Sequence, residues 1–434
     1  MPLFCFHDKI HYMIKVLILG GGFGGIRCAL GLSKKFSHST SSGQEGQVQI
    51  ALVDRNSYHL FLPSLYEVAS ICGIKKDPFA VKIRETICIP YGKIFSEKNI
   101  NFIQAEISTV DLKSKSIRTK GDEVLPYDYL VIALGSQTAD FGILGVREYA
   151  YQFKNINDAI AINEKIEKLI KKISFEEKMS PLKILIGGAG FTGVELAAEI
   201  SCYVNKMYRK NRIRNRRAEI TLIEAGSKIL SMVSENERRI IYKRLTELGV
   251  VLMENSPIEE VGTDFVKLKS GQTLEGDMII WTAGIKANDF LRSIIDLPLT
   301  EKGKIIIDEN LQIEKWKNVF AVGDNQEFID PKTQKPVPAL AYTAVDQGKV
   351  VAENIYNLLN GKKLKKYKPF YGVWIAPVGG KFALAHLWGG WLVTGFMGWL
   401  VRGLVDLRYL ISILSFRKAI NIFWQEITMF TKND

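Results

Sequence analysis

The sequence predicts an α/β fold with two similar strand–turn–helix units and a helical C-terminal region. Three observations predict it: two glycine-rich turns that each follow an apolar strand, an acid at the end of the next strand in both units, and an apolar, tryptophan-rich stretch near the C-terminus. The 434 residues suffice for two or three domains. Hydrophobic residues make up 47% and charged residues 24% of the chain, a composition typical of globular proteins.

Charge and cysteine content narrow the choice of partners. The 58 Lys and Arg exceed the 46 Asp and Glu, and the formal charge of +12 favours a polyanionic partner such as anionic lipid, phosphorylated ligands or nucleic acid. No recognised module supports nucleic-acid binding, so none is expected. The five cysteines form no CxxC pair, which predicts neither a metal site nor a redox dithiol and fits a reduced, cytoplasmic setting. Residues 1–12 contain no signal-peptide pattern, and no function is assigned to them.

The first glycine-rich turn lies between a strand predicted over 15–19 and a helix predicted over 26–32. In the G-x-G-x-x-G pattern, the first glycine allows the turn, the second lets a pyrophosphate approach and the third lets helix and strand pack closely. The helix N-terminus supplies free N–H groups to the phosphates. The three positions are Gly20, Gly22 and Gly25.

The second turn repeats this arrangement between a strand predicted over 183–186 and a helix predicted over 194–200. Its three spaced glycines are Gly188, Gly190 and Gly193. One such pattern is weak evidence, because any strand–helix turn rich in glycine looks similar. Two copies in the same context favour a pair of Rossmann-type dinucleotide-binding units.

Each unit also has a second strand that ends in an acid placed to bind a ribose diol. Asp54 follows the strand predicted over 48–53, and Glu224 follows the strand predicted over 219–223. Both acids come later than the usual interval of about 20 residues. The polar insertion 37–47 and the basic stretch 206–217 account for the delay.

Three further motifs resemble the crossover and flavin-ribityl motifs of two-dinucleotide-binding flavoproteins: residues 129–136, 279–284 and 318–324. Within that superfamily, the segments 54–69 and 188–199 are similar to type II NADH:quinone oxidoreductases. The resemblance extends from Lys15 to the C-terminus. It implies that an NADH-binding domain is inserted into an FAD-binding domain. The expected ranges are 13–150 and 286–365 for the two segments of the FAD domain, 151–285 for the NADH domain and 366–434 for a membrane-association or dimerisation domain.

The resemblance also implies the site residues. For FAD they are Gly20, Gly22, Phe23, Gly25, Asp54, Pro63, Gly135, Asp324 and Ala344; for NADH they are Gly188, Gly190, Gly193, Glu195, Glu224 and Gly284. Asp324 is expected to bind the ribityl chain. Glu224 would accept a hydrogen bond from the ribose 2′-OH and so favour NADH over NADPH. Three nearby arginines weaken this inference, because they could bind a 2′-phosphate; here they are interpreted as a solvated basic face: Arg214, Arg216 and Arg217.

The implied reaction moves a hydride from NADH to FAD and then two electrons to a membrane quinone, without proton pumping. The resemblance places Glu195 near the flavin as the candidate catalytic residue, where it would relay a proton or orient the nicotinamide. The simpler alternative is that Glu195 only complements a helix N-terminus. Cys28 stands alone where disulfide reductases of the superfamily carry a cysteine pair, which excludes a dithiol mechanism.

The electron acceptor is less well defined because the quinone motif is altered. The family pattern Ala-Gln-x-Ala-x-Gln-Gln reads Ala-Tyr-Thr-Ala-Val-Asp-Gln over 341–347. An anionic Asp346 beside a quinone would repel the quinol anion unless it were protonated or turned away. The residues expected to border the acceptor are Ala341, Tyr342, Gln347 and Lys381.

Three alternative functions remain. One is a soluble NADH-dependent reductase of another acceptor, which the altered motif permits and the apolar tail opposes. Another is an NADH-binding signalling flavoprotein. The third, sulfide:quinone oxidoreductase, needs cysteines beside the flavin, and none follows Cys202.

The C-terminal region predicts attachment to a membrane. The stretch 382–401 is long enough to span a bilayer, but its glycines and polar interruptions favour shorter elements and peripheral attachment. Over 400–416 and 418–430, apolar residues alternate with basic ones in a pattern typical of helices at the headgroup level: Arg402, Arg408, Arg417 and Lys418. A homodimer interface would show the same pattern. With the basic linker 361–368 we expect a homodimer on the cytoplasmic face of the cell membrane.

Overall fold

The computed structural model describes residues 13–37, 48–71, 82, 85–175, 181–211, 213 and 218–430. Residues 1–12, most of the polar insertion over 37–47, and Arg214, Arg216 and Arg217 lie outside these described ranges. The chain divides into two compact units. The first takes its residues from 1–59, 90–136 and 287–371, and the second from 60–89, 137–286 and 372–434. The four domain ranges expected from the sequence stay a prediction.

The first unit is built on a six-stranded sheet with the order β21–β22–β9–β1–β2–β5. The five strands from β22 to β5 are parallel, and β21 pairs antiparallel at the edge. Both strands predicted around the first glycine turn are present. The bounds are β1 (Ile14–Leu19), β2 (Val48–Asp54), β5 (Asn101–Gln104), β9 (Tyr129–Ile132), β21 (Gln312–Ile313) and β22 (Trp316–Ala321).

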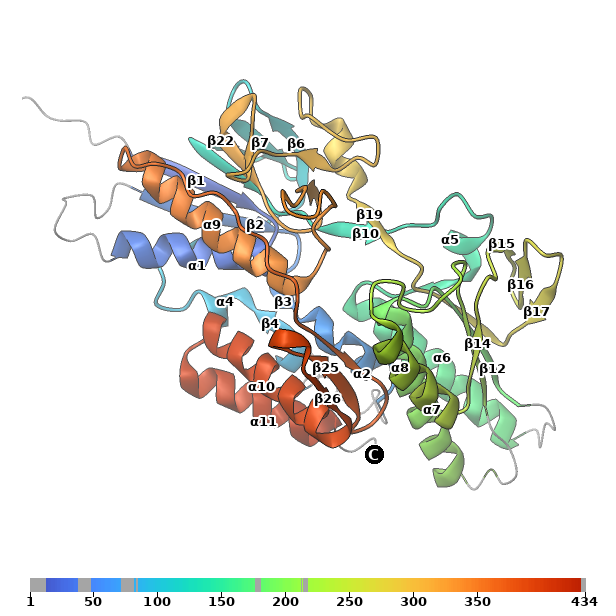
Figure 1. Cartoon of the computed structure of the whole chain (residues 1–434). Helices are drawn as coiled ribbons and strands as arrows, with labels where there is room; N and C mark the ends of the chain where they lie inside the picture. Colours follow the sequence, from blue (N-terminus) through green and yellow to red (C-terminus); the bar gives the residue numbers. More distant parts are fainter. Residues whose placement is uncertain are drawn as a thin grey trace, which may run out of the picture. The chain divides into compact units, whose positions relative to one another are not determined.

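Helices α1 (Phe23–Ser37) and α9 (Ala341–Leu359) pack against each other in this unit (Figure 1). Glycine allows their close approach: a Cβ on Gly348 would lie 2.4 Å from the carbonyl oxygen of Gly24, and a Cβ on Gly24 would lie 3.2 Å from that of Ala344. The close packing fixes the N-terminal ends of both helices. α1 begins at the third residue after Gly20, where a phosphate-binding helix is expected to begin.

The remaining elements of the first unit cover its sheet. Apolar side chains of β1, β9 and β22, among them Leu17, Leu130 and Val319, share one buried cluster with Val110 and Ile117. The last two residues belong to an antiparallel three-stranded sheet. The additional elements are β6 (Ile107–Asp111), β7 (Ser116–Thr119), β8 (Val124–Pro126), α4 (Tyr91–Ile94), η2 (Asp289–Ser293), β20 (Ile305–Ile306) and β23 (Gln326–Glu327).

The second unit contains a five-stranded parallel sheet with the order β11–β18–β12–β13–β14. Its central strand β12 leads into the second glycine turn, as predicted. The strands are β11 (Tyr151–Gln152), β12 (Lys183–Gly187), β13 (Glu219–Ile223), β14 (Val250–Met253) and β18 (Met278–Trp281), and the long helices are α6 (Ile156–Phe175), α7 (Phe191–Lys210) and α8 (Glu235–Glu247).

The second unit also contains short helices and strands, and two further small sheets are present among the described residues. In the second unit they are η1 (Leu62–Ser64), α2 (Leu65–Ala69), α5 (Val146–Tyr149), β15 (Ile258–Val261), β16 (Phe265–Leu268) and β17 (Thr273–Glu275). Two further two-stranded sheets pair β3 (Tyr58–Leu60) with β4 (Cys88–Pro90) and β10 (Ser136–Thr138) with β19 (Ile285–Ala287).

The apolar stretch 382–401 is divided among several short elements and the start of a helix. The C-terminal elements are β24 (Trp374–Pro377), β25 (Ala383–His386), η3 (Trp388–Gly390), β26 (Leu392–Thr394), α10 (Gly395–Ile413) and α11 (Phe416–Phe430). None of the helices among the described residues is both long and apolar enough to cross a membrane. The two parallel sheets, each leading into a glycine-rich turn, confirm the predicted two-unit α/β architecture.

One detail of the C-terminal prediction is wrong. Arg402 was expected among the basic residues of a helix at the headgroup level, yet its side chain is only 11% exposed. It forms an ion pair with Glu67 of α2 at 2.7 Å. The periodicity of α10 alone cannot reveal this, because a basic residue beside an apolar stripe faces either water or a buried acid.

Candidate functional site

The first glycine turn has the geometry expected of a phosphate-binding loop. Gly20 has a φ of +102°, and a Cβ there would lie 2.3 Å from the carbonyl oxygen of Ala133. A Cβ on Gly25 would lie 1.9 Å from the carbonyl oxygen of Gly20. At Gly22, by contrast, a Cβ would meet nothing within 4 Å. The fold itself thus requires the first and third glycines, and the space beside the second is free for a pyrophosphate.

The backbone of Gly21, between these glycines, is held on both sides. Its N–H donates to Oδ2 of Asp54 at 2.7 Å. Its carbonyl oxygen accepts hydrogen bonds from the Tyr91 hydroxyl at 2.9 Å and from Nδ1 of His59 at 3.1 Å. Burial lowers the pKa of His59 to about 4, so this imidazole is neutral at neutral pH. Sequence reasoning missed the roles of His59 and Tyr91, because no local motif ties either residue to the turn.

The second turn repeats this geometry in the second unit. Gly188 has a φ of +99°, and a Cβ there would lie 2.4 Å from Cα of Ala283. A Cβ on Gly193 would lie 1.9 Å from the carbonyl oxygen of Gly188, whereas one on Gly190 would meet nothing within 4 Å. Each unit therefore has one loop in which only the middle glycine of the pattern faces open space, and this arrangement fits one dinucleotide per unit.

Each of the two strand-end acids accepts a hydrogen bond from a backbone N–H group of its glycine-rich loop. Asp54 accepts from the N–H of Gly21, and Glu224 accepts from the N–H of Ala189 at 2.8 Å. The other oxygen of Glu224 accepts from the N–H of Gly226 at 2.7 Å. Both carboxylates are thus fixed beside the loop, at the position where such an acid meets a ribose diol.

Asp324 follows β22 in the first unit and lies beside the end of β9. Its Oδ2 accepts a hydrogen bond from the hydroxyl of Ser136 at 2.7 Å. The neighbouring Asn325 accepts from the N–H of Gly135 at 3.2 Å and donates to the carbonyl of Ile132. These contacts bring the two motifs predicted over 129–136 and 318–324 together at the carboxyl ends of parallel strands, where α/β sheets bind their ligands.

The altered motif over 341–347 forms the first turns of α9. Gln347 is buried, and its Oε1 accepts a hydrogen bond from the N–H of Gly323 at 2.7 Å, so it holds the residue before Asp324. The hydroxyl of Tyr342 is buried and has no hydrogen-bond partner among the described residues. Asp346 pairs with Lys349 at 2.7 Å on a partly exposed side of the helix. Lys381 is exposed between β24 and β25 in the second unit.

The other expected cofactor residues lie at the ends of elements. Phe23 is the first residue of α1 and packs edge-on against His59, with ring centroids 4.8 Å apart. Ala344 lies on α9 beside Gly24 of α1. Pro63 lies in η1 and Gly284, with a φ of +123°, follows β18, both in the second unit. Their cofactor roles stay predictions.

Glu195 lies in the first turns of α7, in the second unit, and is partly exposed. Burial raises the pKa of its carboxyl group to about 8; Arg402 acts against this rise and Asp406 adds to it. At neutral pH this carboxyl group is therefore mostly protonated. A carboxyl group that titrates near the working pH is suited to exchange a proton with a substrate.

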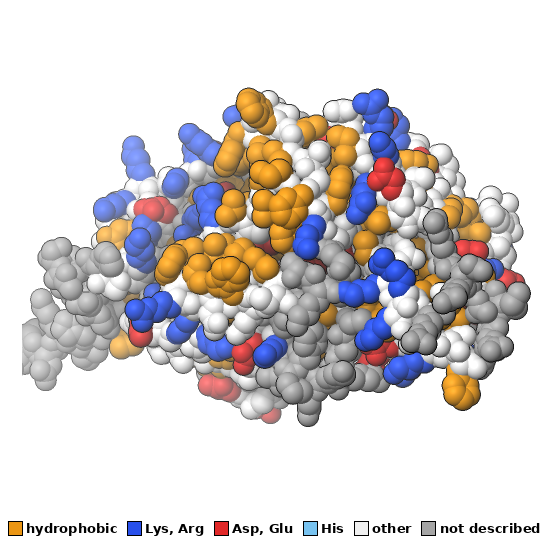
Figure 2. Space-filling view, turned by 90° about the horizontal axis from the view of Figure 1, so that it is seen from below, with side chains coloured by type: hydrophobic (Ala, Val, Ile, Leu, Met, Phe, Trp, Pro, Cys, Tyr) orange, Lys and Arg blue, Asp and Glu red, His pale blue; other side chains and the backbone are white. Residues whose placement is uncertain are grey.

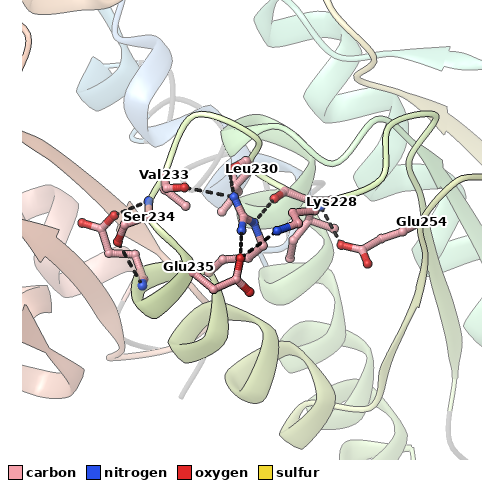
Figure 3. A network of polar contacts seen from close by, with 9 residues as sticks. Lys228, Leu230, Val233, Ser234, Glu235 and Glu254 are labelled. Atoms are coloured by element: carbon pink, nitrogen blue, oxygen red, sulfur yellow. Dashed lines mark hydrogen bonds and ion pairs between the residues drawn. The ribbon is translucent and has the colours of Figure 1, made fainter.

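A polar network fixes the loop between Glu224 and α8 (Figure 3). The buried guanidinium group of Arg238 donates to the carbonyl oxygens of Ile229, Leu230 and Val233 and to the carboxylate of Glu235. The N–H of Leu230 donates to the carbonyl oxygen of Ala189 at 3.0 Å. The network therefore ties this loop to the second glycine turn. The sequence signal that could have found it is the capping box of Ser234 and Glu237 at the start of α8.

Comparison with known proteins identifies the family. The family model described as pyridine nucleotide-disulphide oxidoreductase matches residues 14–348. The chain belongs to the pyridine nucleotide-disulphide oxidoreductase family. Unlike the dithiol members that this family name evokes, the chain carries Cys28 as a lone, buried cysteine on α1, and burial raises the pKa of its thiol.

Relatives within the pyridine nucleotide-disulphide oxidoreductase family cover nearly the whole chain. A type II NADH:quinone oxidoreductase of Staphylococcus haemolyticus is 28% identical over 414 residues, which cover 93% of this chain and 98% of that protein. The protein of the same name from Staphylococcus aureus is 29% identical over 361 residues, which cover 82% of this chain and 85% of that protein.

Two solved structures share the fold of this chain. NDH2 of Plasmodium falciparum, solved in complex with NADH, superimposes with a TM-score of 0.81 at 19% identity, covering 96% of this chain and 99% of that one. The sulfide:quinone oxidoreductase of Aquifex aeolicus gives a TM-score of 0.74 at 20% identity, covering 94% of this chain and 92% of that one. Together the comparisons confirm the predicted resemblance, the oxidoreductase class and the cofactor pair FAD and NADH.

Proposed function

We propose that the chain is an FAD-dependent NADH:quinone oxidoreductase that moves no protons across a membrane itself. The observation that carries this proposal is the pair of phosphate-binding loops, one in each unit, each with a strand-end acid beside it and open space at its middle glycine. The names of the two staphylococcal relatives support the choice of NADH and a quinone as substrates.

The overall reaction balances as NADH, a quinone and one proton giving NAD⁺ and a quinol. When bound, FAD supplies the redox chemistry by accepting a hydride and passing on two electrons. The residues of the chain bind the two dinucleotides and orient them for the reaction. The first glycine turn and Asp54 hold the FAD diphosphate and ribose, Asp324 holds its ribityl chain, and the second glycine turn with Glu224 holds NADH. Glu195 holds or releases the proton that the reaction consumes.

The region proposed to bind the electron acceptor differs from the family's quinone motif within residues 341–347. Ala341, Tyr342 and Gln347 in the first unit are the residues proposed to border the quinone, and the role expected for Lys381 stays a prediction from the sequence. Asp346 is paired with Lys349 on a partly exposed side of α9, and this pairing weakens the repulsion that its carboxylate would exert on a quinol anion. The unpartnered hydroxyl of Tyr342 is available to donate a hydrogen bond to a quinone oxygen.

Steady-state kinetics test this function. Purified, FAD-loaded protein should oxidise NADH rapidly with a short-chain quinone and slowly without it, and NADH should be preferred to NADPH by at least about tenfold, because Glu224 repels a 2′-phosphate. NADH oxidation that is unaffected by any quinone would contradict the choice of acceptor and favour a soluble reductase of another acceptor.

The C-terminal elements supply a surface proposed to bind the membrane. Figure 2 shows a face on which hydrophobic side chains form broad patches bordered by Lys and Arg. Large apolar side chains of η3, α10 and α11 and their connections are exposed: Trp388, Trp391, Phe396, Met397, Leu400, Leu404, Val405, Ile411, Phe416 and Trp424. Exposed tryptophans beside basic residues suit the interface of an anionic bilayer. We place this surface on the cytoplasmic face of the cell membrane, with a homodimer presenting two copies.

Vesicle flotation tests this attachment. Replacing Trp388 and Trp391, which are 65% and 75% exposed, with serine should reduce binding to anionic vesicles by at least about tenfold, because two interfacial aromatic anchors are lost. The control is Phe175→Ser, which removes a 93% exposed ring from α6. Unchanged flotation together with loss of a dimer in sedimentation would show that the surface pairs two copies of the chain instead.

A further inference from the structure

Phe141, in the second unit, has a backbone conformation that side chains of its size rarely adopt. It belongs to the turn over 140–143, which is closed by a hydrogen bond from the N–H of Ile143 to the carbonyl oxygen of Asp140 at 3.0 Å. Both central residues of this turn have a positive φ, +53° at Phe141 and +70° at Gly142. Turns with this backbone favour Gly, Asn and Asp at both positions, so the preferences of the turn do not account for a phenylalanine.

The turn is held in place by contacts with the end of β18. The indole N–H of Trp281 donates to the carbonyl oxygen of Ala139 at 2.7 Å, and the N–H of Ala139 donates to the carbonyl oxygen of Gly284 at 3.1 Å. Within the turn, the side chain of Asp140 accepts a hydrogen bond from the N–H of Gly142 at 3.2 Å. A strained conformation persists only where its surroundings fix it, and these contacts supply that constraint.

Packing in the core does not account for the ring of Phe141 either, because the residue is 67% exposed. The edge of the ring lies against Gly284, where a Cβ would lie 3.0 Å from Cζ of Phe141. An asparagine at this position would relieve the backbone strain and replace an exposed apolar ring with a polar side chain. The stability of the fold alone therefore does not explain the ring, whereas a ligand that packs against it would.

The segment 282–284 connects Phe141 with the second glycine turn. The hydroxyl of Thr282 donates to the carbonyl oxygen of Gly188 at 2.9 Å, and a Cβ on Gly188 would lie 2.4 Å from Cα of Ala283. The next residue along the chain is Gly284, which the ring of Phe141 meets. The ring is therefore placed beside the loop proposed to bind NADH, on the side of β18.

The order of the strands indicates which half of NADH extends to this side. The strands β18, β12 and β13 are consecutive neighbours in the sheet of the second unit. Glu224 after β13 is placed to bind the adenosine ribose, and the glycine turn after β12 is placed to bind the pyrophosphate. A dinucleotide that crosses these two strand ends continues over the third, so its nicotinamide half extends over the end of β18. Gly284 and the ring of Phe141 lie at that end.

We propose that the ring of Phe141 packs against the nicotinamide half of NADH. This inference deepens the proposed function: it rests on the assignment of NADH to the second loop and adds the side chain that binds the reacting half of the dinucleotide. The exposed ring offers an apolar face to the nicotinamide ring, and two such rings attract each other when they stack. Because the turn fixes the backbone of Phe141 before NADH binds, little conformational entropy is lost on binding.

Calorimetric titration of the FAD-loaded protein tests this contact. NAD⁺ is the probe, because it carries the nicotinamide ring but donates no hydride to the flavin, and ADP-ribose is the matched probe that lacks this ring. Phe141→Asn should raise the dissociation constant for NAD⁺ by about tenfold and leave that for ADP-ribose within about twofold of the unmodified value. Phe141→Tyr keeps the ring and should retain the unmodified affinity for NAD⁺.

Thermal unfolding separates this role from a structural one. The unfolding midpoint of Phe141→Asn should be unchanged or higher, because asparagine tolerates the positive φ of this position. Two controls match the two changes that this variant makes. Lys115→Asn relieves a φ of +51° in an exposed turn of the first unit, and Phe175→Asn removes a 93% exposed side chain from α6. Neither control should change the affinity for either probe.

The outcomes distinguish the inference from the function on which it rests. If Phe141→Asn does not fold, Phe141→Gly, which also suits the turn, decides. Equal weakening of NAD⁺ and ADP-ribose binding overturns the proposal, because the ring would then act on a part that both probes share. Unchanged binding of both probes rejects the inference alone. An unmodified protein that binds neither probe would reject the proposed function together with the inference.

Discussion

Replacing Gly190 with valine is expected to raise the dissociation constant for NADH by at least about a hundredfold while leaving the FAD content unchanged. A Cβ at Gly190 meets no atom within 4 Å, so the protein should fold normally. The valine side chain would instead fill the space beside the second loop, where the pyrophosphate must approach the backbone within hydrogen-bond distance. Binding of NADH by fluorescence quenching and FAD content by absorbance measure the two effects.

The matched variant in the first unit should have the reverse effect. Gly22→Val should yield folded protein that has lost its FAD, because Gly22 also faces open space. Gly121→Ala serves as a control, since a Cβ at Gly121 meets only Oγ1 of Thr119, at 3.7 Å, and the residue lies in the exposed turn between β7 and β8. Loss of both cofactors from Gly190→Val would contradict the assignment of one dinucleotide to each loop.

Glu195→Gln should reduce kcat by about a hundredfold, the effect typical of losing a general acid or base. The pKa of this carboxyl group is raised to about 8, so it is protonated below that pH and ionises above it. Turnover that needs its proton should therefore fall as the pH rises through about 8 in the unmodified protein, and Glu195→Gln should lack this inflection. The pH dependence of kcat between about pH 6 and pH 10 measures the difference.

A second variant separates a chemical role from a structural one. Glu199→Gln, one helical turn further along α7, also neutralises a buried acid. It should keep the inflection near pH 8. If Glu195→Gln kept both its rate and its inflection, Glu195 would only complement the N-terminus of α7.

The sequence was sufficient to predict the two Rossmann units because their signals are local. Gly20 and Gly188 need a positive φ, and a Cβ on Gly25 or Gly193 would lie 1.9 Å from the carbonyl oxygen of the first glycine of the same motif. Helix ends were less well predicted. The helix predicted over 194–200 is α7, which continues to Lys210 and so includes part of the basic stretch that was interpreted as an insertion. Tertiary packing, not local propensity, decides where such a helix ends.

Contacts between distant segments could not be predicted from the sequence. His59 and Tyr91 hold the carbonyl group of Gly21 from separate elements, and no spacing rule relates these residues to the first loop. Arg402 and Asp406 carried a partial signal, because acidic and basic residues four positions apart within an apolar helix form an ion pair on one face. That signal does not reveal Glu67 or Glu426, which only the folded chain brings to the same helix.

Anaerobic stopped-flow absorbance tests the central claim most directly. Mixing the FAD-loaded protein with NADH should bleach the flavin band in one rapid phase, and subsequent mixing with a short-chain quinone should restore it at a rate at least equal to kcat. A flavin that NADH reduces but no quinone reoxidises would contradict the account and direct the search to another acceptor. A flavin that NADH does not reduce would reject the proposed function entirely.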